Sequence, residues 1–212
     1  SRINYYDYFR RYNDEQLIEL IKNLLYVHEI PHAEIIFVEN YLLFLKKLMR
    51  VLNKNMTLLD AFIQCENYEI VKQEFNKLLQ TQAIDFSVFD YYMNQYIGFH
   101  TTEFISIEMF IVLLFKNTGC PPSRCSTIQL DEINQDVHLY LINEMMKVTH
   151  QPLILIEDHK QYNTQTLKHF FEMNKEDYPL IAIFKDIFLH EEFISQIPYL
   201  FSTKIYLNHS EH

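Results

Sequence analysis

Apolar side chains recur every three or four residues through the first 150 positions, which is the spacing of one face of an α-helix. The first such stripe follows Asn13, and Gln16 stands three residues later, as in a capping box. We therefore expect a helix to begin after Asn13. Its inward residues are expected to be Leu17, Ile18, Ile21, Leu24 and Leu25.

The same spacing predicts helices at four further places, and Thr57 is expected to open the second of them. They are Tyr41–Leu52, Leu58–Cys65, Ile105–Lys116 and Leu130–His150. No Gly or Pro interrupts residues 68–96, so this stretch predicts one very long helix or two abutting helices, with Gly98 as the stop. The short apolar run Ala33–Val38 has the length of a strand and is expected to form one.

The last third of the chain changes character, because its apolar residues form short continuous runs typical of strands buried on both faces. Strands are expected at Pro152–Ile156, Leu180–Phe184 and Lys204–Leu207, with helices at Thr164–Met173 and Glu191–Ile197 between them. Alternating strands and helices indicate a parallel sheet with right-handed crossovers.

These elements predict an α/β fold that is helix-rich overall. Residues 1–56 and 126–212 would form a small parallel sheet core, and residues 57–125 an inserted long-helix sub-domain. The core has P-loop-like order without a P-loop, since the chain has only two glycines, Gly98 and Gly119, and no G-x-x-x-x-G-K-[ST] motif. This excludes a nucleotide hydrolase that uses such a loop. A G-x-S-x-G motif is absent too, so we expect a binding or assembly protein and not an enzyme.

The net charge of −10 would repel nucleic acid unless basic residues gather locally. Four cations follow helical spacing, with no acid among them from Tyr41 to Asn55, and form a candidate DNA-binding ridge. They are Lys46, Lys47, Arg50 and Lys54. Arg10, Arg11 and Lys72 are further candidate DNA contacts. The alternative interpretation of the ridge is an ordinary solvated helix face.

Two other functions stay open. Glu157, Asp158 and Asp186 follow predicted strands, at the edge of a parallel sheet where ligands bind, so a metal-dependent nuclease could be assembled there. The alternative is solvated loop charge. The abundance of Tyr (15) and Phe (17) would instead suit the interfaces of a protein-only adaptor.

Cysteines and apolar runs bear on the cellular setting. Three cysteines do not make a disulfide framework. Cys120 and Cys125 have a loop spacing that a disulfide or a zinc site could use, with free thiols as the alternative. The longest apolar run, Met109–Phe115, is too short to cross a bilayer, and Ser1–Tyr5 lacks the apolar core of a signal peptide. We therefore expect a cytoplasmic protein without a membrane partner.

Several stretches, spread over about three-quarters of the chain, resemble the type II-A CRISPR adaptation proteins, the ring-forming DNA-end clamps of spacer acquisition. Asn55–Asp60 and Glu69–Leu78 are similar to the family's entry into its long helices, and Glu103–Met109 to its short loop and following helix. The run from Gln151 to Tyr206 follows the family's final strands and helix. The family's first strands are not evident in Ser1–Asp14.

The resemblance implies a homotetrameric ring that holds double-stranded DNA in a positively charged hole, without catalysis. It also implies work alongside the CRISPR integrase and effector nuclease, and it makes calcium a candidate cofactor. Glu103 and Glu108 are the acids near the family's calcium segment that could serve here, although calcium takes six to eight oxygen ligands.

Overall fold

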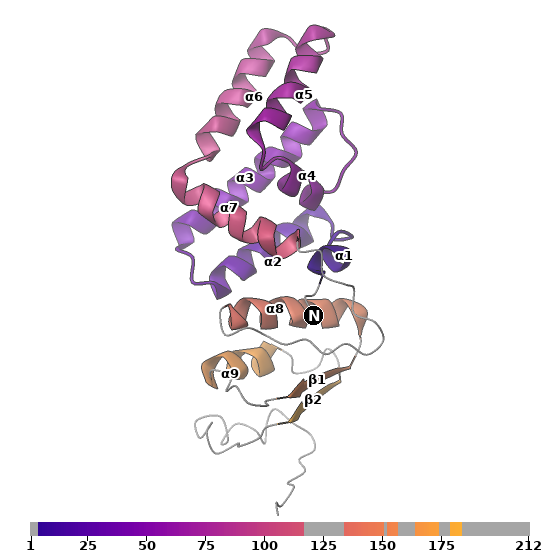
Figure 1. Ribbon diagram of the computed structural model, residues 1–212, viewed down its shortest axis with the longest axis vertical. Coiled ribbons are helices and arrows are strands. Elements are labelled where there is room, and N and C mark those ends of the chain that lie inside the picture. Colours follow the sequence, from indigo (N-terminus) through magenta and orange to yellow (C-terminus); the bar gives the residue numbers. More distant parts are fainter. Residues whose placement is uncertain (1–3, 117–133, 151, 157–163, 174–178, 184–212) are drawn as a thin grey trace, which may run out of the picture. The chain divides into compact units, whose positions relative to one another are not determined.

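The computed structural model describes residues 4–116, 134–150, 152–156, 164–173 and 179–183 (Figure 1). The chain divides into two compact units, Ser1–Leu130 and Asp131–His212. The described part is helix-rich with a small parallel sheet, as predicted. The expected elements Glu191–Ile197 and Lys204–Leu207 lie outside the described residues.

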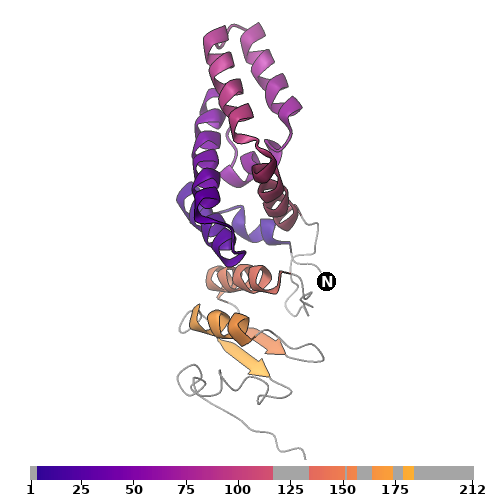
Figure 2. The same cartoon turned by 90° about the vertical axis from the view of Figure 1, so that its left-hand side faces the viewer.

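The described part of the first unit is entirely helical. Its helices are α1 (Tyr5–Phe9), α2 (Asp14–Val27), α3 (His32–Val51), α4 (Leu58–Gln64), α5 (Tyr68–Gln80), α6 (Phe86–Phe99) and α7 (Thr102–Phe115). Helix α3 packs against α2, α4 and α6, and α5 and α6 form a helical hairpin (Figures 1 and 2). Residues 1–56 belong to this unit together with α4–α7, whereas the sequence grouped them with 126–212. The inserted sub-domain therefore stays a prediction.

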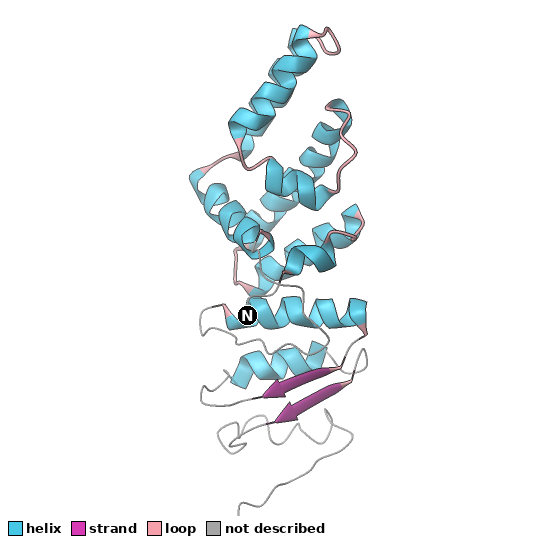
Figure 3. Ribbon diagram, turned by 45° about the vertical axis from the view of Figure 1, so that its right-hand side comes forward, coloured by secondary structure: helices cyan, strands magenta, loops and turns pink. Residues whose placement is uncertain are grey.

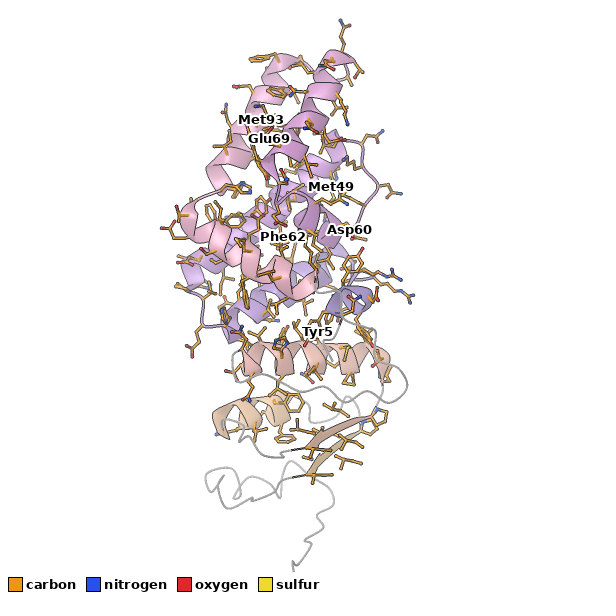
Figure 4. The ribbon with its side chains drawn as sticks, in the orientation of Figure 1. Tyr5, Met49, Asp60, Phe62, Glu69 and Met93 are labelled. Carbon is orange, nitrogen blue, oxygen red and sulfur yellow. The ribbon has the colours of Figure 1, made fainter. Side chains whose placement is uncertain are left out.

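The local helix signals are confirmed. The Asn13 side chain accepts a hydrogen bond from the Gln16 N–H, and the Gln16 side chain accepts one from the Asn13 N–H. Thr57 is the N-cap residue of α4, and its side chain accepts a hydrogen bond from the Asp60 N–H. The five inward residues expected on α2 are all buried, and Phe62 and Met93 also lie inside the helical unit (Figure 4). Burial of these apolar side chains is the main force that holds the helices together.

Two expectations for this unit need correction, and a third, which left one long helix or two helices open for residues 68–96, is decided in favour of two. The strand expected at Ala33–Val38 is wrong, because these residues form the first turns of α3. The stretch 68–96 forms two helices, separated by a turn that ends at Asp85, the N-cap of α6. Gly98 is not a stop, because α6 runs through it to Phe99.

Helices α2, α3 and α5 end in left-handed turns that use no glycine. Glu29, Asn53 and Gln82 have φ angles of 58°, 51° and 57°. After α5, the Gln82 N–H bonds to the carbonyl of Leu79, and the next N–H bonds to the carbonyl of Leu78. This pattern is a Schellman turn, in which glycine is the usual left-handed residue.

Helices α6 and α7 meet at a sharp elbow of 85°. Only His100 and Thr101 separate them. The Thr101 hydroxyl accepts a hydrogen bond from the Phe104 N–H and so caps α7. The cap begins the new helix in a new direction.

The described part of the second unit contains α8 (Gln135–Thr149), β1 (Leu153–Ile156), α9 (Thr164–Met173) and β2 (Leu180–Ile183). The strands are parallel, and α9 lies between them in sequence as the crossover (Figure 3). Leu153 pairs with Leu180 at one end of the sheet. Within β1, Leu155 is buried but Ile154 is 55 % exposed, so the described strands are not buried on both faces as predicted.

Candidate functional site

The predicted cationic ridge lies on α3 and on the turn that follows it. Two of its members are neutralised by acids from other helices. Lys46 Nζ lies 3.0 Å from the Asp14 carboxylate of α2, and Lys54 Nζ lies 3.0 Å from the Glu74 carboxylate of α5. These lysines join helices to one another and have less charge to offer a phosphate.

Lys47 and Arg50 are the other two members, and both are exposed. They stand three residues apart on α3 and therefore lie on neighbouring turns of one helix face. Neither has an acidic partner among the residues that the structure describes. This pair is the part of the ridge that remains able to contact an anionic ligand.

The remaining predicted DNA contacts are dispersed over other elements. Arg10 and Arg11 are exposed just after α1, with Arg10 3.9 Å from the Asp7 carboxylate. Lys72 lies on α5, with its Nζ 5.5 Å from the centre of the Tyr68 ring. Arg10 and Arg11 follow α1 and Lys72 lies on α5, so none of the three shares a helix with Lys47.

The structure does not bring the two predicted calcium ligands together. Glu103 is exposed in the first turn of α7, whereas Glu108 is buried at 2 % exposure. Five residues on a helix turn the direction of a side chain by about 140°. No group of three or more His, Cys, Asp or Glu residues that could hold a metal ion occurs in the described ranges.

A histidine and a glutamate meet at the α6–α7 elbow, with Glu108 buried and His100 half-buried, and helical spacing does not predict this contact. Nε2 of His100 is 3.5 Å from Oε2 of Glu108. On the other side of the ring, Nδ1 of His100 is 2.7 Å from the backbone carbonyl oxygen of Tyr96. Burial lowers the pKa of His100, but the Glu108 carboxylate and the Tyr96 carbonyl together raise it above 6.5.

Two tyrosines and a cysteine surround the pair. The Tyr41 ring meets His100 edge-on at 5.5 Å, and the Tyr96 hydroxyl donates to the backbone carbonyl of Cys65. Burial raises the pKa of Cys65 to about 12. Burial and then the charge of Glu108 raise the pKa of Tyr41 and of Tyr96. The Cys65 thiol therefore stays protonated near neutral pH and is a poor nucleophile.

One signal in the sequence could have located this pair. Glu108 falls in phase with Phe104, Ile111 and Phe115, all of which are buried on the inner face of α7. A carboxylate on an apolar stripe needs a partner, because burial of an unpaired charge is costly. His100 lies across the elbow from it, and helix periodicity alone does not show that proximity.

Glu157, Asp158 and Asp186 lie outside the described residues, as do Cys120 and Cys125. Cys65 is a free, buried thiol.

Within the described residues, no single helix is long and apolar enough to cross a membrane, although the bent pair α6–α7 would meet the criteria of length and composition together. Comparison with known protein families, with curated proteins and with solved structures finds no match to this chain.

Proposed function

We propose that the chain is a non-catalytic protein that binds double-stranded DNA, and DNA ends in particular, during CRISPR spacer acquisition. In this proposal it acts in the cytoplasm as a homo-oligomeric ring, a homotetramer by resemblance, beside the CRISPR integrase and effector nuclease. Its core would have P-loop-like order with the helices of 57–125 inserted. The parallel β1–α9–β2 unit is compatible with such a core.

The observation that carries the proposal is the exposed pair Lys47 and Arg50 on α3. A helix face with two adjacent cations, and with no acidic partner in the described part of the chain, can follow the phosphates of one DNA strand. Contacts of this kind carry no sequence information, so binding would depend on the backbone. A ring would reconcile them with the net charge of −10, because acidic surfaces could face outward.

The direct test measures binding of a short blunt-ended duplex by fluorescence anisotropy over a salt series. Each phosphate contact contributes about 0.9 to the slope of log affinity against log salt concentration. We expect the double variant Lys47→Gln/Arg50→Gln to reduce the slope by about 2. Closed circular DNA should compete less well than linear DNA if ends are recognised.

A matched control removes the same charge from cations that are already paired. Lys22 lies 3.3 Å from a carboxylate oxygen of Glu39, and Lys77 lies 2.8 Å from one of Glu74. Lys22→Gln/Lys77→Gln should leave the slope unchanged. An equal fall of the slope in the two double variants would mean that only net charge matters, and not the position of Lys47 and Arg50. Binding that does not depend on salt would overturn the proposal, and so would a strictly monomeric mass in light scattering.

A protein-only adaptor is the second candidate, and one surface favours it. Ile105, Met109 and Leu113 recur every four residues along α7 and are 42 %, 51 % and 66 % exposed. Such a stripe is suited to protein contact. An adaptor would show no DNA affinity even at low salt. A nuclease would instead cleave DNA on addition of magnesium or manganese, a result that would overturn both binding proposals.

A further inference from the structure

The elbow between α6 and α7 is closed by side chains from both helices. His100 is the C-cap residue of α6, and Glu108 lies in the second turn of α7. Their 3.5 Å contact therefore spans the 85° bend. Glu108 is 2 % exposed, so little water reaches the carboxylate to replace the imidazole.

The hydrogen-bonding geometry determines the protonation state that the elbow requires. The Tyr96 carbonyl oxygen can only accept, so Nδ1 of His100 carries a proton in this arrangement. Nε2 faces a carboxylate, which also only accepts when ionised. Opposite an ionised Glu108, both ring nitrogens therefore carry protons, and the imidazolium attracts the carboxylate by charge at 3.5 Å without a hydrogen bond from Nε2.

The neighbouring titratable groups do not compete for this role. Tyr41 faces the pair from α3, Tyr96 from α6 and Cys65 from the end of α4. Burial raises the pKa of each of the three, as described above. They remain neutral over the range in which an imidazole titrates.

Two more distant charged side chains act on these neighbours, and each forms an ion pair with another residue. Lys54, which lowers the pKa of Cys65, is paired with Glu74. Glu66, which raises the pKa of Tyr96, is paired with Lys116. The charged side chain that acts on His100 is Glu108.

We propose that His100 is a proton switch for the α6–α7 elbow: the imidazolium locks the bend through Glu108, and loss of its proton releases the bend. His100 would act in this way whether or not the chain binds DNA. Because the folded pKa is raised above 6.5, the stabilisation is fully present below pH 6.5 and is lost as the pH rises through the folded value. Deprotonation removes the cation that faces the buried Glu108 side chain across the bend.

The first experiment follows the His100 ring by NMR titration in the intact chain and in Glu108→Gln. The wild-type ring should titrate above 6.5, and the variant should titrate at least about one pH unit lower. The second measures amide hydrogen exchange at Phe104 and Ile105, corrected for intrinsic rates. As the pH rises and His100 loses its proton, the protection of these two amides should fall. The total fall should be about tenfold for each unit by which the His100 pKa in the closed elbow exceeds its pKa in the open elbow.

His28, the C-cap residue of α2, serves as the control, because it contacts α7 away from the elbow. His28 stacks on Phe110 of α7 with ring centroids 4.1 Å apart, without an ion pair among the described residues. His28→Gln should leave the pH dependence at Phe104 intact. A wild-type His100 that titrates at or below 6.5, or identical pH dependence in wild type and Glu108→Gln, would overturn the switch. The wild-type titration decides the matter even if the variant fails to fold.

Discussion

Lys54 and Glu74 form an ion pair, 3.0 Å between Nζ and Oε2, that joins the turn after α3 to the middle of α5. Glu74 also accepts from Lys77 at 2.8 Å. The pair ties the α5–α6 hairpin to the rest of the helical unit. It also leaves Lys54 with less charge to offer an anionic ligand than an unpaired lysine would have.

Glu74→Gln should lower the free energy of unfolding by about 0.5–1 kcal/mol at pH 7, the range of partly exposed ion pairs. Hydrogen bonds from Lys77 and then Lys54 hold the pKa of Glu74 below 4.5. The contribution is therefore present above pH 4.5 and is lost as the pH falls through the lower, folded value. Urea denaturation at pH 7 and pH 3 checks this, and exposed Asp90→Asn is the control, with no change expected.

Tyr96→Phe should cost about 1–3 kcal/mol, because the buried Cys65 carbonyl would lose the hydroxyl that donates to it. Tyr96 is 1 % exposed, so water cannot easily take the place of the hydroxyl. Tyr91→Phe, at 59 % exposure on the same helix, should be neutral. Equal melting temperatures for the two variants would contradict the assigned hydrogen bond.

Gln82→Gly should stabilise the chain by about 0.5–1 kcal/mol, since glycine adopts φ of 57° without the strain of a Cβ. Asn53→Gly should gain less, because Asn tolerates left-handed backbone better than Gln does. Gln73→Gly, inside right-handed α5, is the control and should cost about 1 kcal/mol. Thermal unfolding should show a higher melting temperature for Gln82→Gly and Asn53→Gly and a lower one for Gln73→Gly.

Gly98→Ala should stabilise α6 by about 0.5 kcal/mol. Gly98 lies within the helix, and a Cβ placed there meets nothing within 4 Å. Alanine therefore gains helix propensity and loses less backbone freedom on folding. Chemical denaturation provides the measurement, and a destabilised variant would mean that the helix ends before this position.

Helix starts were predictable from sequence because their signals are local. Asn13 and Gln16 bond to each other over three residues, as their spacing indicated. The failure at Ala33–Val38 has an equally definite cause, because a six-residue apolar run fits a strand and a buried helix alike. Ile35 and Val38 are buried on the inner face of the 20-residue helix α3, which settles the choice.

The candidate sites were less predictable, because their chemistry depends on residues that are distant in sequence. Helical spacing correctly indicated a row of cations on α3, but not that Asp14 would reach Lys46. The family resemblance named Glu103 and Glu108 together as candidate calcium ligands, although one is exposed and the other is buried. Ion pairs between elements follow from packing, and packing cannot be read from the periodicity of one helix.

The 85° elbow gives the α5–α6 hairpin the mechanics of a lever arm. Helix α6 has 14 residues and is therefore about 21 Å long from its pivot at His100. A change of about 10° at the pivot would move the far end of the helix, near Phe86, by about 4 Å. Loss of one proton at the half-buried His100 ring would thus become a displacement large enough to follow by distance measurements between probes on α3 and at the far end of α6.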